Sequence, residues 1–407
     1  MKNINLNCTK CGKEFSSKEI NFRCDICNEP LELEEIKTGK ITEGNILSQN
    51  ILERYSDFFP FLNLTKEVSL GEGFTTLTKS SNLAKNIGVK ELYFKNESQN
   101  PTWSFKDRGT VTALQHALNL GFKKIGTVSS GNMAPSVAAY GSKSNLETFI
   151  FVKQGIPSEK INPIAIYNPN LLKINGNYDD IYLESYRVGK ENNIYFMNSD
   201  VPFRVEGSKT IAFEICEQLN FKMPDYVVVP TSSGGNTRGI EKGFREFKNC
   251  GLINKIPKII CAQASGCSPI VEAYENGREE INRFENANTI AHAIENPFPP
   301  SGNQMLRMLK VNGGMAVGVT DEEIIDAQGI LARDGIFIQP ASAVPLAAVI
   351  KLKNQNYLNE NDSVVCVVTG SGLKYTAAFE KHKLNTIDCN IEDLSSVIRG
   401  IKNDNRK

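Results

Sequence analysis

The chain has 407 residues, and its 46 basic side chains balance 46 acidic ones, so the formal net charge at neutral pH is zero. This length predicts two or three domains, and an apolar share of 40% with a charged share of 23% is typical of a soluble globular protein. Zero net charge gives no electrostatic reason to expect nucleic acid or an anionic membrane as the main partner.

Targeting signals and cysteine usage indicate the compartment. No apolar run approaches the ~20 residues that would span a bilayer. The opening residues, MKNINLNCTKCGKEF, lack the apolar centre of a secretory signal. Of the ten cysteines, four cluster near the start and six are scattered, mostly within apolar segments. We therefore expect a cytoplasmic protein with reduced thiols that binds neither a membrane nor nucleic acid.

Residues 1–35 are predicted to form a separate small domain. They contain two Cys-x2-Cys pairs separated by twelve residues. This spacing is typical of zinc ribbons and rubredoxin-like domains, in which each pair directs two thiolates to one tetrahedral metal. A metal-free ribbon and a pair of disulfides are the alternatives. The predicted zinc ligands are Cys8, Cys11, Cys24 and Cys27.

Three segments of the body share one pattern, a β-rich apolar run followed by a small-residue loop and a helical pattern. They are KKIGTV with SSGN at 123–132, DYVVVP with TSSGGN at 225–236, and SVVCVV with TGSG at 363–372. Helices are expected directly after each loop, the third over 373–383. Such runs are typical of strands buried on both faces of a parallel sheet, whose carboxyl ends bind ligands.

Two further helices are predicted towards the end of the chain. Residues 321–335 begin with acidic side chains, space their apolar positions three and four apart, and stop at a glycine. Residues 341–355 are apolar on most faces, which predicts a buried helix. The tail from about residue 386 is expected to be frayed.

The loop after the second strand is a candidate phosphate site. SSGGN offers successive backbone N–H groups at the start of a helix, which together form an anion cradle. It has neither the Gly-Lys-Ser/Thr of a P-loop nor the dinucleotide pattern GxGxxG, so ATP and NAD are disfavoured. A flexible turn is the alternative. Thr369 ends a buried strand, where its hydroxyl needs a partner, either a ring heteroatom or a backbone carbonyl.

Lys106 lies in NPTWSFKDRGT, residues 100–110, beside aromatic side chains. Partial desolvation would lower the pKa of this amine and make it a nucleophile and a base. A reactive lysine, a phosphate cradle and a polar group for a ring nitrogen are together what pyridoxal 5′-phosphate requires.

The segment NESQNPTWSFKDRGT resembles the cofactor-lysine segment of fold-type II pyridoxal-phosphate enzymes, and most closely that of the threonine synthase family. The resemblance continues through SSGNMAPSVAAYGSKS, VPTSSGGN, QASGCSPIVEAY and GIFIQPASAVPLAAVIKL. It implies an α/β fold like that of the tryptophan synthase β-subunit, with two parallel-sheet lobes in residues 36–407. A smaller lobe, about 111–205, would be inserted in a larger one, about 50–110 and 206–385, before the tail at 386–407.

The resemblance also implies roles for the site residues. Lys106 would bind the cofactor covalently and later shuttle protons, with Phe105 beside it, and Asn132 would hydrogen-bond the cofactor's 3′-oxygen. Thr369 would face the pyridine nitrogen. The cofactor phosphate would be held by Ser233, Gly234, Gly235, Asn236 and Thr237.

A second set of residues would contact the substrate. Ser129 and Ser130, with Asn132 and Met133, would lie at its carboxylate. A guanidinium flanked by amide and hydroxyl donors is a suitable phosphate clamp, which favours a small phosphorylated amino acid over a plain serine or threonine. The residues at the family's substrate-phosphate positions are Asn198, Ser199 and Arg204.

The chain departs from the family's usual residues at substrate-facing positions. Trp103 replaces a glycine and would narrow the pocket or cover the cofactor ring. Met133 replaces a threonine and Gln339 a glutamate. Ser371 replaces a frequent histidine, and residues 295–304 differ from the usual segment.

The resemblance implies a lyase of amino-acid biosynthesis that makes threonine from O-phosphohomoserine and water. The alternatives are an enzyme acting on another phospho-amino acid such as O-phosphoserine, as in cysteate synthase, and a serine or threonine dehydratase. A binding protein that retains the fold without activity is a third alternative, disfavoured by the retained lysine and loops. The resemblance implies a homodimer.

Overall fold

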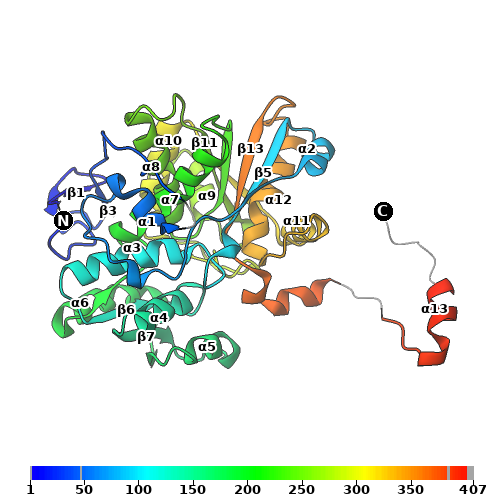
Figure 1. Cartoon of the computed structure of the whole chain (residues 1–407), viewed down its shortest axis with the longest axis horizontal. Coiled ribbons are helices and arrows are strands. Elements are labelled where there is room, and N and C mark those ends of the chain that lie inside the picture. Colours follow the sequence, from blue (N-terminus) through cyan, green and yellow to red (C-terminus); the bar gives the residue numbers. More distant parts are fainter. Residues whose placement is uncertain (1, 46–47, 383–385, 401–407) are drawn as a thin grey trace.

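The computed structural model describes residues 2–45, 48–382 and 386–400, and two twisted sheets dominate it (Figure 1). Helices pack on both sheets, and the cysteine-rich N-terminal segment lies at one end of the larger one. The helices are α1 (Ile51–Arg54), α2 (Ser81–Ile87), α3 (Lys106–Asn119), α4 (Met133–Lys143), α5 (Ser158–Ala165), α6 (Tyr178–Asn192), α7 (Pro202–Gln218), α8 (Gly235–Asn249), α9 (Pro269–Glu275), α10 (Gly302–Asn312), α11 (Asp321–Arg333), α12 (Pro340–Asn354) and α13 (Leu394–Gly400).

The larger sheet has six strands, and all neighbours are parallel except the antiparallel edge strand β4. Its central strands are runs of Val, Ile and Cys buried on both faces, which confirms the parallel sheet expected from those runs. In spatial order the strands are β12 (Met315–Val319), β11 (Lys258–Ala264), β10 (Tyr226–Pro230), β13 (Ser363–Val368), β5 (Glu91–Asn96) and β4 (Leu77–Lys79).

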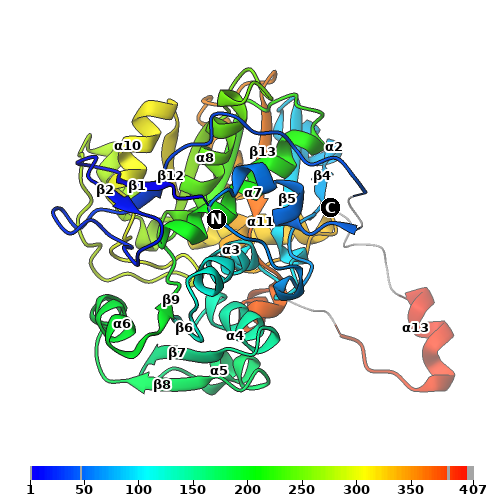
Figure 2. The same cartoon turned by 60° about the vertical axis from the view of Figure 1, so that its left-hand side comes forward.

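The smaller sheet is fully parallel and lies below the larger one in Figure 2. The predicted strand at 123–128 is its β6, so the SSGN loop comes from a different sheet than the loops after β10 and β13. The spatial order is β8 (Asn170–Ile174), β7 (Glu147–Lys153), β6 (Lys124–Val128) and β9 (Tyr195–Phe196).

Helices α3, α7 and α8 form a closely packed group that carries the lysine segment. A Cβ on Gly207 of α7 would lie 2.2 Å from the carbonyl oxygen of Arg108 in α3, so only glycine permits this approach. Gly239 of α8 is similarly close to the backbone of Val205, at 2.3 Å. This packing fixes the start of α3 relative to the start of α8.

The N-terminal segment has a fold of its own but not a core of its own. Its antiparallel strands β1 (Asn5–Cys8), β2 (Glu14–Ser16) and β3 (Leu31–Leu33) form a separate sheet. However, Leu6, Phe22 and Leu31 are buried in the same apolar cluster as the body's Phe213. The segment is therefore more closely joined to the body than the expected separate domain.

The C-terminal region differs from the sequence prediction. The helix expected over 373–383 is replaced by 3₁₀ turns at Gly372–Lys374 and Thr376–Lys381, and residues 383–385 lie outside the described chain. The expected frayed tail contains the short helix α13, which buries none of its residues and extends away from the body (Figure 1). Residues 401–407 of that tail also lie outside the described chain. Within the described residues no helix combines the length and apolarity needed to cross a membrane.

Candidate active site

Lys106 is the first residue of α3, and the segment before it is tied to the end of β13. The backbone N–H of Phe105 donates to the carbonyl of Thr369 at 3.0 Å, and that of Ser371 donates to the carbonyl of Trp103 at 3.0 Å. Thr369, predicted to face the cofactor ring, is therefore held beside the lysine segment.

The amine of Lys106 is half-buried and lies 4.5 Å from the centre of the Phe105 ring. Burial, and to a smaller extent the nearby positive charge of Arg204, together lower its pKa to about 7. A large fraction of the amine is consequently neutral at neutral pH, as a nucleophile or general base requires.

Arg204 is a buried guanidinium that forms no ion pair among the described residues. It donates to the hydroxyl of Thr110 at 2.9 Å and to the carbonyl of Lys106 at 3.1 Å. Within the described chain no carboxylate lies within ion-pair distance of it, and burial lowers its pKa to about 10. It remains charged at neutral pH, so a bound anion would offset the cost of its burial.

The SSGGN loop leads from β10 into α8, as predicted. Gly234 has φ +92°, a left-handed conformation that favours glycine, and α8 begins at the next residue. Both side-chain amide atoms of Asn236 are buried, and in the described chain neither has a hydrogen-bond partner. An orphaned amide next to the free N–H groups of a helix start fits a phosphate, so this loop suits the cofactor group expected there.

Thr237 and Ser233, also predicted to hold the cofactor phosphate, are oriented by neighbours. The hydroxyl of Thr237 lies 2.9 Å from that of Thr231, and Ser233 accepts a backbone hydrogen bond at its carbonyl from Ser301 at 3.1 Å. Ser301 belongs to residues 295–304, the segment that departs from the family pattern. This segment thus lies directly against the predicted phosphate loop.

Asn132 from the SSGN loop also reaches the end of β13. Its side-chain nitrogen donates to the side-chain oxygen of Gln339 at 3.3 Å, and the backbone N–H of Gln339 donates to the carbonyl of Gly370 at 3.2 Å. Ser129 and Ser130 are half-buried at the same loop. The loop after β6 and the loop after β13, one from each sheet, therefore lie close together, and Gln339 contacts both.

The hydroxyl of Thr369 is buried and lies 3.0 Å from that of Ser342, in the first turn of α12. Ser342 also accepts the backbone N–H groups of Thr369 and Gly370, at 3.1 and 2.8 Å. A side-chain hydroxyl thus partners Thr369, where the sequence suggested a ring heteroatom or a backbone carbonyl. Sequence reasoning missed Ser342, although a serine in an otherwise apolar buried helix was the available signal.

Residues 198–201 turn into the start of α7, which carries Arg204, and this stretch, called the 198–204 turn below, lies close to the SSGGN loop. A Cβ on Gly235 would lie 2.5 Å from the carbonyl oxygen of Ser199. The amide of Asn198 is buried, accepting from the Val128 backbone N–H at 3.0 Å and donating to the Ser185 hydroxyl at 2.9 Å. In this structure Asn198 therefore supports the turn, and its contact with substrate remains a prediction.

Trp103 and Met133 differ in exposure, since Trp103 is exposed and Met133 is buried. Trp103 has φ +63° and its side chain is 52% exposed, and its effect on the pocket or the cofactor ring remains a prediction. The positive φ belongs to a tight turn and explains why glycine is usual at this position. Met133 is the first residue of α4 and is buried in the apolar core.

Lys374 is a second amine that the sequence analysis did not select. Its nitrogen lies 6.0 Å from the centre of the Trp103 ring, and burial lowers its pKa to about 8. Within the described residues no carboxylate lies within ion-pair distance of it. The only feature of the sequence that could have indicated Lys374 was its position five residues after Thr369.

Asp107 and Arg108 belong to the scaffold. The Asp107 carboxylate accepts from the Thr102 hydroxyl and the Ser136 hydroxyl, both at 2.6 Å. Arg108 is fully buried between two carboxylates, with Glu97 at 2.6 Å and Glu214 at 2.6 Å. Both side chains stabilise the start of α3 and need no chemical role.

The four N-terminal cysteines converge as their spacing predicts. One sulfur from each residue lies within 4.8 Å of the others, and the Cys8 and Cys27 sulfurs are 3.3 Å apart. All ten cysteines are free thiols, which argues against the paired-disulfide alternative. Backbone N–H groups of Lys10 and Ile26 point at the Cys8 and Cys24 sulfurs, at 3.5 and 3.4 Å, as in a tetrahedral thiolate site.

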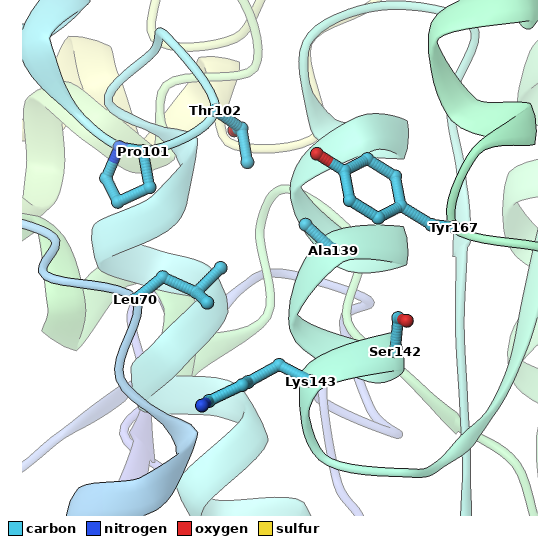
Figure 3. A pocket seen from close by; sticks show the side chains of 7 residues that line it. All are labelled: Leu70, Pro101, Thr102, Ala139, Ser142, Lys143 and Tyr167. Atoms are coloured by element: carbon cyan, nitrogen blue, oxygen red, sulfur yellow. The ribbon is translucent and has the colours of Figure 1, made fainter.

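A cavity of about 400 Å³ is lined on one side by Pro101 and Thr102 of the lysine segment. Figure 3 shows Pro101 and Thr102 on one side of it and Tyr167 on the other, with Ala139 of α4 between them and Ser142 and Lys143 of the same helix below. None of the predicted cofactor or substrate residues lines this cavity, so it is not the predicted reaction site.

Comparison with known proteins agrees with this arrangement. Residues 68–370 match the family described as pyridoxal-phosphate dependent enzyme. The chain is 41% identical to a threonine synthase of Methanocaldococcus jannaschii, covering 90% of this chain and 92% of that one. It is 36% identical to a threonine synthase of Methanosarcina acetivorans, covering 97% of this chain and 98% of the relative.

Solved structures with the same fold include maize serine racemase and threonine deaminase isoform 2 of Solanum lycopersicum. The first has a TM-score of 0.65 at 22% identity over 75% of this chain and 91% of that one. The second has a TM-score of 0.66 at 20% identity over 86% of this chain and 98% of that one. These likenesses support the fold alone. The family match and the full-length relatives place the chain among the pyridoxal-phosphate dependent enzymes, in the threonine synthase family.

Proposed function

We propose that the protein is a threonine synthase, a lyase that converts O-phosphohomoserine and water into threonine and inorganic phosphate. The observation that carries this proposal is the identity to threonine synthases over almost the whole chain, at 41% and 36%. The half-buried Lys106 amine beside the buried, unpaired Arg204 supports it, because such a pair suits a substrate that carries phosphate.

The cofactor would be held by the residues that the sequence analysis selected. Bound pyridoxal phosphate supplies an electron-accepting ring that stabilises negative charge on the substrate's carbon atoms. Gly234, Gly235 and Asn236 would bind its phosphate through backbone N–H groups and an amide that is otherwise unpartnered. The Thr369 hydroxyl would face the ring nitrogen. A hydroxyl does not enforce protonation of that nitrogen as a carboxylate would, which suits elimination and replacement chemistry.

Lys106 would carry the proton transfers. Its neutral amine would accept the proton from the α-carbon and then relay a proton from the β-carbon. Phosphate would leave from the γ-carbon, and water would then add at the β-carbon. Arg204, with Ser199 and Asn198 in the same turn, would bind the phosphate as it leaves, because the guanidinium remains charged at neutral pH.

We further propose a structural zinc ion bound by Cys8, Cys11, Cys24 and Cys27, which the convergence of their sulfurs supports. The proposed enzyme is a cytoplasmic homodimer. Its smaller lobe comprises about residues 111–205, inserted between residues 50–110 and 206–385, and this division follows the two sheets.

A second candidate reaction uses another phospho-amino acid, such as O-phosphoserine with sulfite as the replacing group. The departures at Trp103, Met133 and Gln339 favour it, since Gln339 contacts Asn132 and so alters the surroundings of the substrate carboxylate. The test is phosphate release from O-phosphohomoserine and from O-phosphoserine, each with and without sulfite. Turnover of O-phosphohomoserine alone supports the threonine synthase; turnover of O-phosphoserine alone contradicts it.

A further inference from the structure

The cysteine-rich segment contacts the elements that carry the predicted phosphate sites. Arg238 of α8, two residues after Asn236, donates to the carbonyl of Leu31 at 3.2 Å, and Lys242 donates to that of Leu33 at 2.5 Å. Arg307 of α10 forms an ion pair with Glu29 at 2.6 Å. Contacts of this kind join the segment to the helix that begins at the SSGGN loop.

Arg23 contacts the turn that carries the predicted substrate-phosphate residues. Its side chain is 15% exposed and forms an ion pair with Asp200, which is 1% exposed. One of its terminal nitrogens also donates to the carbonyl of Pro300 at 3.3 Å. Pro300 precedes Ser301, which donates its backbone N–H to Ser233 in the SSGGN loop.

Asp200 lies inside the turn that carries Asn198, Ser199 and Arg204. One of its carboxylate oxygens accepts from the hydroxyls of Tyr182 and Tyr186, the latter at 3.1 Å. The other oxygen faces Arg23. Without that guanidinium the turn would contain a buried, unneutralised carboxylate one residue from Ser199, and its charge would oppose a phosphate bound there.

The second cysteine knuckle holds the same guanidinium through other nitrogens. The Arg23 Nε donates to the carbonyl of Asn28 at 2.9 Å and to its side-chain oxygen at 3.1 Å. Asn28 closes the second knuckle, since its backbone N–H donates to the carbonyl of Cys24 at 3.0 Å. The residues that position Arg23 are therefore those that bring the Cys24 and Cys27 sulfurs to the metal site.

We propose that Arg23 is a positioning residue for the substrate-phosphate turn, held in place by the cysteine knuckle. It neutralises Asp200, and it fixes the 198–204 turn relative to residues 300–301 and the SSGGN loop. Arg23 touches neither substrate nor cofactor and acts through Asp200. This inference rests on the proposed function, because it assigns the turn to the phosphate of the substrate.

The test uses the full-length protein with its cofactor bound. Inorganic phosphate is titrated calorimetrically, and kcat and KM for O-phosphohomoserine are measured separately. Arg23→Ala is expected to weaken phosphate binding and raise KM by about tenfold, as loss of one partner of a buried ion pair predicts, while kcat changes less than about threefold. Adding Asp200→Asn to Arg23→Ala removes the unneutralised charge and is expected to restore at least half of the lost binding free energy.

Lys10→Ala is the matched control, because it removes another ion pair between the cysteine-rich segment and the body, that with Glu280, at an exposed place. It is expected to leave phosphate binding and KM unchanged. If Arg23→Ala does not fold, Arg23→Lys and Asp200→Asn replace it. Arg23→Lys retains the positive charge, and Asp200→Asn removes the negative charge that Arg23 neutralises. Both variants are therefore expected to bind phosphate within about threefold of the unaltered protein.

Three results would overturn the proposal: unchanged phosphate binding and KM in folded Arg23→Ala, a double variant no better than the single one, or a tenfold loss of phosphate binding in Asp200→Asn. The titration needs no turnover, whereas O-phosphohomoserine turnover by the unaltered protein tests the proposed function. Failure of the Arg23 proposal and failure of the proposed function can therefore be told apart.

Discussion

Lys106 differs from a surface lysine because of residues that are distant in the sequence. An exposed lysine has a pKa near 10.4 and is almost fully protonated at neutral pH. Burial within the convergence of three loops, together with the charge of Arg204, lowers the Lys106 pKa to about 7. The segment around Lys106 identified the residue, but only the folded structure gives it this environment.

This environment predicts how the rate of cofactor capture depends on pH. Only the neutral amine attacks an aldehyde, and a lowered pKa means that the neutral form prevails above the pKa of about 7. When pyridoxal phosphate is added to cofactor-free protein, the capture rate is expected to rise through pH 7 and level off above about pH 8. The measurement is the growth of absorbance near the visible edge from pH 6 to 9.

Substitution of the neighbouring charge tests the cause of that shift. Arg204→Gln removes a positive charge close to the amine, so the midpoint is expected to move to higher pH. Arg187→Gln, at an exposed arginine that pairs with Glu184 and Glu191, is the control and is expected to leave the midpoint unchanged. A midpoint near pH 10 in the unaltered protein would contradict the buried environment of Lys106.

At the scale of elements, the sequence pattern predicted those strands and helices that their own residues favour. The apolar runs at 123–128, 225–230 and 363–368 are strands, because Val and Ile runs suit burial on both faces of a sheet. The helix predicted over 321–335 is present as α11, with Thr320 and Glu323 forming a capping box. The SSGGN loop precedes a helix as its glycines indicate.

After β13, packing against other parts of the chain accompanies a structure that differs from the helix the sequence pattern predicts. The sequence pattern predicts a helix over 373–383, but the described part of this region contains 3₁₀ turns. A Cβ on Gly372 would lie 2.6 Å from the ring of Phe337 and 2.7 Å from that of Phe379, so these stacked rings cover the backbone at the start of the segment. Phe337 is distant in the sequence, and the periodicity of 373–383 gives no information about it.

The close contact between the SSGGN loop and the 198–204 turn predicts that adding one methyl group at Gly235 weakens cofactor binding. In Gly235→Ala the new Cβ would lie 2.5 Å from the carbonyl oxygen of Ser199, so the loop or the turn must shift. We expect pyridoxal phosphate to bind roughly tenfold more weakly, because close-packed interiors accommodate added methyl groups poorly. Absorbance titration of cofactor-free protein measures this affinity.

Gly176→Ala is the matched control, since its added Cβ would meet only Ile181, at an ordinary 3.7 Å. It is expected to bind the cofactor as the unaltered protein does. Unchanged cofactor affinity in Gly235→Ala would show that the loop is not held against Ser199.

At the scale of the whole molecule, the contacts that the sequence did not predict join distant segments. Arg108 pairs with Glu97 and with Glu214, which is 106 positions away. Arg23 pairs with Asp200 at a separation of 177 residues. Single-sequence patterns report periodicity and turn chemistry, whereas such partners follow only from how the elements pack.

The shared core predicts the effect of losing the metal. Because Leu6, Phe22 and Leu31 belong to the body's apolar cluster, unfolding of the cysteine-rich segment exposes part of that cluster. The double variant Cys8→Ser and Cys11→Ser is expected to contain no zinc and to unfold at a temperature lower by about 5 °C or more. Metal analysis and calorimetry measure the two effects.

Cys216→Ser is the control, since this buried thiol lies outside the cluster of four sulfurs. It is expected to retain the full zinc content. Unchanged zinc stoichiometry in the double variant would exclude the four-cysteine site.

The most direct measurement is the product balance with O-phosphohomoserine as the only substrate. The purified protein with pyridoxal phosphate is expected to release threonine and inorganic phosphate in equal amounts, and Lys106→Ala neither, because it lacks the amine that moves the protons. Phosphate release without threonine, equal products from Lys106→Ala, or no turnover of O-phosphohomoserine by cofactor-loaded protein would contradict a threonine synthase that works through Lys106.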